Sequence, residues 1–439
     1  MGLDGSHEYA YQSGQNRAID KQITLLLGLA LPQRIIAALG QHGAEVRFCG
    51  GVVRDILMGQ LKWPTPDIDM ASPMPPAEAA RILKADNLKV IPTGIDHGTI
   101  TVMMPTDPDL KVELTTLRVD HNPDGRHAEV GFIEDWNTDA SRRDFTFNSF
   151  YMTASGDIID PFGGRDDLEA GLVRFIGNPK DRITEDVLRI FRYFRFYARF
   201  GHSAIEPETA TALIDAAPLI SGLSGERIAT ELKKTLSYQS LETFALMEDL
   251  GIWQALTGDR LCLDDYAALL DLGIDDDAIL GLAALTPASN CDGLAARLKL
   301  SKKDIDKLKR ISTLLGEDQM TVLLSPDYIQ ECWRLCRRHD WSLADIAGAM
   351  IITSIRAGKH YAALKHITVD HIRDQVRMIR MAEWPDMPVN GDDIRAHGLV
   401  EGRQIGTLLK QLEDIWVTEG FVPNRRTLLT YLAEWLAKD

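Results

Sequence analysis

Three features that classify many proteins are missing from this 439-residue sequence. It contains no run of about 20 consecutive apolar residues, so we expect no transmembrane helix and no membrane partner. It does not begin with a basic segment followed by an apolar stretch and a cleavage site, so we do not expect secretion. Cysteines are few, and the odd, scattered set favours a reducing, cytoplasmic environment over a disulfide framework: Cys49, Cys262, Cys291, Cys332 and Cys336.

A metal-ligand cluster is also hard to build from these cysteines. Cys332, Cys336 and His339 fall at helical spacing, but a fourth ligand is missing, so we interpret them as an ordinary helix face. His339 is followed by Asp340, a pair that could indicate a phosphohydrolase domain. No supporting histidines surround it in the sequence, and we take it as surface sequence.

Basic residues are outnumbered, with 48 Lys and Arg against 64 Asp and Glu and a net charge of −16. This balance opposes a nucleic-acid substrate, because affinity for phosphates comes largely from Lys and Arg. Net charge does not settle the matter, since binding depends on where the charge lies. The question is whether the basic residues cluster.

The chain divides into a mixed part and a helical part. A polar leader over residues 1–30 grades into a helix, and strands and helices then alternate from about 33 to 175. Beyond about 180 the strand signals vanish, and apolar residues recur at i, i+3, i+4 spacing. The pattern predicts an α+β fold: a small mixed β-sheet with helices, followed by an all-helical half.

Two segments about a dozen residues apart indicate a phosphate and metal site. Gly50 and Gly51 form a turn that opens a short helix, whose backbone N–H groups suit a phosphate. Asp67 and Asp69 share one face of a strand, because side chains alternate with period 2, and a divalent cation would relieve their repulsion. Each signal alone is weak, since a Gly-Gly turn and an Asp-x-Asp are common. Together they favour metal-dependent phosphoryl or nucleotidyl transfer.

A second group of charges follows the mixed part. Arg142 and Arg143 precede Asp144, which alone is equally consistent with a structural salt-bridge cluster. Further on, we predict that Thr184 caps a helix with Glu185 and Asp186 in its first turn.

Four arginines form one stripe on that predicted helix: Arg189, Arg192, Arg195 and Arg199. The stripe contains no lysine, which suits bidentate recognition better than solubility alone. An Asp–Arg pair such as Asp186 and Arg189 complements the Watson–Crick edges of cytosine and adenine and opposes those of guanine and uracil. The alternative is a solvated face with an ordinary i, i+3 ion pair.

These segments together carry a family resemblance. They are Gly50-Gly51-x-x-Arg54-Asp55, Asp67-x-Asp69, Arg142-Arg143-Asp144-Phe145-Thr146, Asp160-Pro161-Phe162-Gly163-Gly164 and Glu185-Asp186-x-Leu188-Arg189. Their order resembles that of bacterial class II tRNA nucleotidyltransferases, the CCA-adding enzymes of the DNA polymerase beta superfamily, which share these motifs with bacterial poly(A) polymerases. The resemblance is strong over residues 35–235 and general beyond.

The resemblance implies a catalytic head, a neck that selects the base, and a helical body and tail that hold tRNA. The implied boundaries are 1–30 for the leader, 31–155 for the head, 156–235 for the neck, 236–330 for the body and 331–439 for the tail. The implied partners are tRNA, CTP and ATP; the oligomeric state stays open.

The resemblance also implies a role for each motif residue. Asp67 and Asp69 would bind two Mg²⁺, with Glu113 as the candidate third carboxylate. Gly50, Gly51 and Arg54 would hold the triphosphate. Arg143 and Asp144 would contact the nucleotide, with Asp144 near the ribose hydroxyls. The base would be read by Asp186 and Arg189, with Arg192 and Arg195 beside them. A flexible loop that switches addition from C to A would include Asp120, Asp124, Gly125 and Arg126.

Within the family the sequence favours full CCA addition. Residues 93–99 lack the basic run typical of the poly(A) polymerases, and the loop is not shortened as in enzymes that add only CC. Poly(A) polymerase activity or partial addition remains an alternative. So do a transferase acting on a small hydroxyl compound and a catalytically inactive RNA-binding module. Basic groups in the helical half are candidate tRNA contacts: Lys302, Lys303, Lys307, Lys309 and Arg310, then Arg425 and Arg426.

Overall fold

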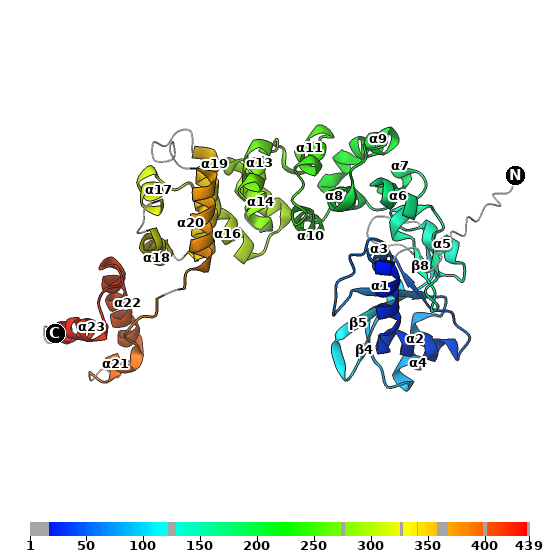
Figure 1. The fold of residues 1–439 in the computed structure, drawn as a ribbon, viewed down its shortest axis with the longest axis horizontal. Coiled ribbons are helices and arrows are strands. Elements are labelled where there is room, and N and C mark those ends of the chain that lie inside the picture. Colours follow the sequence, from blue (N-terminus) through cyan, green and yellow to red (C-terminus); the bar gives the residue numbers. More distant parts are fainter. Residues whose placement is uncertain are drawn as a thin grey trace. The chain divides into compact units, whose positions relative to one another are not determined.

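The computed structural model describes residues 17–121, 129–273, 277–324, 328–339, 341–357, 368–383, 385–397 and 402–436. Contacts between residues divide the chain into two compact units (Figure 1). The first comprises residues 1–223 with 249–255, and the second comprises residues 224–248 with 256–439. The predicted division into leader, head, neck, body and tail stays a prediction.

The first unit is built on a mixed seven-stranded sheet with the strand order β3-β4-β5-β2-β1-β8-β9. Strands β2 and β5 are parallel, whereas every other neighbouring pair in this sheet is antiparallel. The strands are β1 (Arg47–Cys49), β2 (Ile68–Ser72), β3 (Lys89–Gly94), β4 (Thr99–Met104), β5 (Asp107–Thr116), β8 (Tyr151–Met152) and β9 (Ile158–Ile159). A separate hairpin joins β6 (Arg118–His121) to β7 (Glu129–Phe132). This sheet confirms the predicted α+β fold.

Alternation of side chains separates apolar from acidic residues in strands β2 and β5. In β2, Ile68 and Met70 are fully buried, and Asp69 lies between them on the opposite face. In β5, Val112 is buried while its neighbour Glu113 is exposed. Helices α2 (Ala30–Gly40) and α4 (Pro76–Ala85) pack against each other and against β4 and β5 (Figure 1). Asp69 and Glu113 thus lie on the face of β2 and β5 opposite the buried apolar residues.

The remaining helices of the first unit follow or interrupt the sheet. They are α1 (Arg17–Leu27), α3 (Gly51–Leu57), α5 (Trp136–Ser141), α6 (Gly164–Ala170), α7 (Pro179–Glu185), α8 (Arg189–Phe200) and α9 (Pro207–Ala216). Aromatic rings pack α8 onto the segment that follows Asp144. The ring centroid of Phe196 lies 5.4 Å from that of Phe145 and 5.2 Å from that of Phe147. This packing holds α8 beside Asp144 and the segment that follows it.

The second unit contains only helices among its described residues. They include α10 (Gly225–Leu236), α11 (Leu241–Asp249), α13 (Leu263–Asp271), α14 (Ala278–Leu285), α15 (Cys291–Leu298), α16 (Lys302–Ser312), α17 (Glu317–Leu323), α18 (Tyr328–His339), α19 (Leu343–Ala357), α20 (Val369–Met381), α21 (Gly391–Arg395), α22 (Gly402–Thr418) and α23 (Arg425–Leu436). Helix α12 (Ile252–Thr257) crosses the boundary between the units. The apolar periodicity beyond residue 180 thus predicted the helical half correctly.

No single helix in the described ranges is long and apolar enough to cross a membrane. The bent pair α1 and α2 passes a test of length and composition together. Their apolar residues are used inside the fold, however, because Leu26, Leu31 and Ile35 are fully buried.

Candidate active site

The glycine turn lies directly against an arginine. Gly50 has φ +67°, a conformation that side chains other than glycine rarely adopt. A Cβ atom at this position would lie 3.1 Å from Nη1 of Arg143. The Gly50 amide donates to the carbonyl of Phe150 at 2.9 Å, and α3 begins at the next residue. A side chain at this position would therefore strain the backbone and crowd Arg143.

Three carboxylates gather on and beside strands β2 and β5. Asp69 pairs with Glu113 in the parallel register of β2 and β5, so the two side chains leave the same face on adjacent strands. Asp67 precedes β2 and is exposed. Burial, together with the nearby charges of Asp67 and Glu113, raises the pKa of Asp69 to about 6, against a smaller opposing effect of Arg143. The negative charge at this edge is incompletely compensated.

These donors suit a hard divalent ion. Among the described residues, no three His, Cys, Asp or Glu side chains already converge as a metal cage. Mg²⁺ is commonly held by one or two carboxylates together with water and substrate phosphates, so a complete protein cage is not required. The carboxylates of Asp69 and Glu113, which leave the same face of neighbouring strands, fit this kind of site.

Arg54 is presented by α3 beside the turn. Its side chain is buried, with Nε 2.9 Å from Oδ1 of Asp55 and Nη1 2.5 Å from Oδ1 of Asn148. Burial lowers the pKa of Arg54, and the charge of Asp55 partly restores it. Asp55 also accepts from Nη2 of Arg199 at 2.9 Å. The structure thus brings Arg54 to the glycine turn with its donors already oriented.

Asp144 is a buried acceptor rather than an exposed one. Its Oδ1 accepts from the amide of Phe145 and from Nδ2 of Asn148, both at 2.9 Å. Its Oδ2 accepts from Nε of Arg192 at 2.6 Å. Burial alone would raise the pKa of Asp144, but Arg192 and Asn148 outweigh it and the pKa falls to about 2. The carboxylate therefore stays ionised at neutral pH.

The predicted helix start at Thr184 is wrong. Helix α7 ends at Glu185, Asp186 has extended backbone angles, and α8 begins at Arg189. The cap of α7 is Asn178, whose side chain accepts from the amide of Asp181, and Pro179 follows at the first helical position. Asp186 instead occupies the junction between the two helices, where its Oδ1 accepts from the amide of Leu188 at 3.1 Å.

The arginine stripe of α8 faces protein rather than solvent. Arg189 donates to Oε2 of Glu185 at 2.7 Å and to the carbonyl of Arg142 at 3.0 Å. Arg192 and Arg199 bind Asp144 and Asp55, as described above. The guanidinium of Arg195 lies 4.4 Å from the ring centroid of Phe196. The solvated-face interpretation is therefore wrong for this stripe.

The loop residues predicted from the resemblance fall mainly outside the described residues. Asp124, Gly125 and Arg126 lie outside them, as does the side chain of Asp120, whose backbone forms part of β6. Asp139 in α5 is a further charged residue here, and its signal in the sequence is an Asp three and four residues before Arg142 and Arg143. It accepts hydrogen bonds from both arginines.

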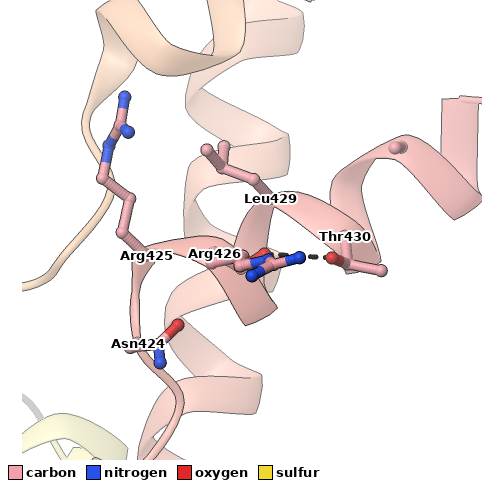
Figure 2. A pocket seen from close by; sticks show the side chains of 6 residues that line it. Asn424, Arg425, Arg426, Leu429 and Thr430 are labelled. Atoms are coloured by element: carbon pink, nitrogen blue, oxygen red, sulfur yellow. Dashed lines mark hydrogen bonds between the residues drawn. The ribbon is translucent and has the colours of Figure 1, made fainter.

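The basic residues of the second unit are largely engaged in ion pairs. Lys307, Lys309 and Arg310 pair with Asp277, Asp292 and Asp345, respectively. Near the start of α23, Arg425 and Arg426 border a hollow of about 650 Å³ (Figure 2). The two side chains point in different directions, and Arg425 pairs with Asp393. A role for these groups in tRNA binding stays a prediction.

A mixed sheet that carries an Asp-x-Asp strand beside a glycine turn and buried arginines defines a nucleotidyltransferase head. Residues 46–174 match the family described as "Poly A polymerase head domain". Residues 204–257 match "Probable RNA and SrmB- binding site of polymerase A".

Relatives that match this chain over most of their length identify its family more closely than the two domain matches do. The chain is 33% identical to "CCA tRNA nucleotidyltransferase 1, mitochondrial" of Danio rerio over 401 residues, which cover 89% of this chain and 87% of that protein. It is 28% identical to the "CCA-adding enzyme" of Lactobacillus gasseri, with 91% and 95% covered. The fold resembles that of the Bacillus stearothermophilus CCA-adding enzyme in complex with CTP (TM-score 0.66, 24% identity, 95% of this chain and 99% of that chain covered). The chain belongs to the CCA-adding tRNA nucleotidyltransferase family.

Proposed function

We propose that this chain adds C, C and A to the 3′ end of tRNA from CTP and ATP, without a nucleic-acid template, and releases pyrophosphate. The observation that carries the proposal is the pairing of Asp69 with Glu113 on one face, beside the turn at Gly50 and the buried Arg54. Relatives named for CCA addition align over most of their own length, and solved relatives include complexes with CTP, ATP and tRNA.

Members of this family use divalent metal ions, and we propose Mg²⁺ for this chain, held by Asp67 and Asp69 with Glu113 as the third carboxylate. Two bound Mg²⁺ would lower the pKa of the primer 3′-hydroxyl and stabilise the charge on the leaving pyrophosphate. The protein would contribute orientation, because Arg54 and Arg143, which we assign to the incoming nucleotide, both lie against the glycine turn.

Base selection is proposed for Asp186, Arg189, Arg192 and Arg195. Arg189 is held by Glu185 and by two backbone carbonyls, which fixes the plane of its guanidinium and leaves only part of its donor set for a base edge. Arg192 is fixed in the same way by Asp144. Preorganised donors of this kind favour one hydrogen-bonding pattern over another. A cytoplasmic location stays a prediction, because the relatives include mitochondrial proteins.

The experiment that tests the function is primer extension on a tRNA that ends before CCA, with Mg²⁺ and each nucleotide alone or in pairs. The proposal predicts two additions from CTP alone and one further addition only when ATP is also present. A long tail from ATP alone would assign the chain to the poly(A) polymerases. Tight tRNA binding with no incorporation would support an inactive binding module.

A further inference from the structure

One buried carboxylate, Asp139 in α5, joins several separate segments of the first unit. Its side chain is 1% exposed. Oδ1 accepts from Nη2 of Arg142 at 2.6 Å and from the amide of Arg118, at the start of β6, at 3.2 Å. Oδ2 accepts from Nη2 of Arg143 at 3.0 Å and from the hydroxyl of Tyr151 in β8 at 2.6 Å.

The Asp139 carboxylate is ionised despite this burial. Burial alone raises its pKa, but the charges of Arg143 and Arg142 and the hydroxyl of Tyr151 outweigh it, so the pKa falls to about 2. A buried ion whose lone pairs are all used in this way is costly to disturb, because removing it leaves its donors without an acceptor. Asp139 therefore holds the side chains of Arg142 and Arg143 in place.

Of these two arginines, Arg143 is the one that lies beside the glycine turn of the candidate site. Nη1 donates to the carbonyl of Asn148 at 3.3 Å and occupies the space that a side chain at Gly50 would need. Its guanidinium carbon lies 5.2 Å from the ring centroid of Tyr151. Nε is buried without a hydrogen-bond partner among the described residues, so the protein satisfies this guanidinium only in part.

We propose that Asp139 is a positioning residue that aims the Arg143 guanidinium at the triphosphate of the incoming nucleotide. The inference rests on the proposed function, because Arg143 is assigned to the nucleotide there. Asp139 accepts from Nη2 of Arg143, whereas Nη1 is the nitrogen beside the glycine turn, so Asp139 acts through the arginine and not on the nucleotide. Losing the contact frees the guanidinium to rotate and weakens nucleotide binding.

The test measures CTP affinity by equilibrium titration and KM and kcat by extension, for Asp139→Asn in the wild-type and Arg143→Gln backgrounds. In the wild-type background the CTP dissociation constant and KM rise roughly tenfold or more, as expected for a lost charge-assisted hydrogen bond. In the Arg143→Gln background the same substitution changes them less than about twofold, because the residue through which it acts is gone.

Asp135→Asn provides the matched control. Asp135 caps the same helix, where its Oδ2 accepts from the amide of Thr138 at 2.8 Å, and asparagine caps helices equally well. We expect it to leave CTP affinity unchanged. An Asp139→Asn effect of equal size in both backgrounds would overturn the proposal, because it would show general structural damage instead of action through Arg143.

If Asp139→Asn does not fold, Asp139→Glu keeps the charge and moves the carboxylate by one methylene. It should raise the CTP dissociation constant in the wild-type background but not in Arg143→Gln, and unchanged affinity in folded protein would overturn the inference. Titration without tRNA separates this outcome from failure of the proposed function. Wild-type protein that binds CTP but extends no tRNA would contradict only the latter.

Discussion

Nε of Arg192 lies 2.6 Å from Oδ2 of Asp144, 48 residues earlier in the chain. From Asp144, hydrogen bonds continue through Asn148 to Arg54, and through Asp55 to Arg199. Arg192 and Arg199 both belong to α8, so the path leaves the helix and returns to it. Proposed phosphate and base contacts are thereby parts of one connected network.

Replacing Arg192 by Gln should destabilise the protein by about 2–3 kcal/mol, because it leaves the buried Asp144 carboxylate without its cation. The measurement is the free energy of unfolding from urea titration. Arg165→Gln removes a more exposed i, i+4 pair with Glu169 and should change this energy by less than about 0.5 kcal/mol. Equal losses in the two variants would contradict the network.

The stabilisation that Asp144 provides should depend on pH. Its folded pKa of about 2 lies below the ordinary value of 3.8, so its contribution is fully present above about pH 4 and is lost as the pH falls towards 2. Asp144→Asn should therefore be less stable than wild type by about 2 kcal/mol at pH 7, with a gap that narrows below pH 4. Asp109→Asn, an exposed change in β5, serves as the control. A gap that does not change with pH would contradict the ionised role.

Removing the Asp69 carboxylate from the proposed metal site should stabilise the protein and abolish its activity. Without metal at pH 8, Asp69→Asn removes a buried charge and its repulsion from Asp67 and Glu113, and should raise the free energy of unfolding by about 1–2 kcal/mol. Added Mg²⁺ should stabilise wild type but not the variant. Thermal unfolding with and without Mg²⁺ measures both effects. A variant that Mg²⁺ stabilises as much as wild type would place the ion elsewhere.

Gly50→Ala tests the close approach of the turn to Arg143. Alanine must adopt φ +67° and place its Cβ 3.1 Å from Nη1 of Arg143, so we expect a loss of about 1–3 kcal/mol and weaker CTP binding. Gly43→Ala shares the positive φ but meets no atom within 4 Å, so it should lose less stability and keep CTP binding. CTP titration of the two variants separates backbone strain from the contact with Arg143.

Local patterns predicted much of the first unit. The strands and helices predicted from about residue 33 to 175 are observed, as in β4 (Thr99–Met104), where alternating apolar residues lie between turns. The resemblance made Glu113 the candidate third carboxylate, and the parallel register of β2 and β5 brings it beside Asp69. The order of the motifs supplied the family.

The sequence could not show which charged groups pair across the fold. The packing of Phe196 against Phe145 brings Arg192 beside Asp144. No rule of sequence spacing predicts such a tertiary contact. The helix start at Thr184 was misplaced because Pro179 and the Asn178 cap start the helix earlier, and Asp186 then ends it. Asp139 had a helical signal, but its bond to Tyr151 links segments that only the fold brings together.

The most direct measurement is to incubate the protein with Mg²⁺, all four nucleotides and a tRNA that lacks CCA, and then to sequence the 3′ ends of the tRNA. Wild type and Asp96→Asn, a change at an exposed carboxylate, should produce ends that read C-C-A, and Asp69→Asn should produce unchanged ends. Tails of repeated A, inclusion of G or U, or undiminished addition by Asp69→Asn would contradict the account.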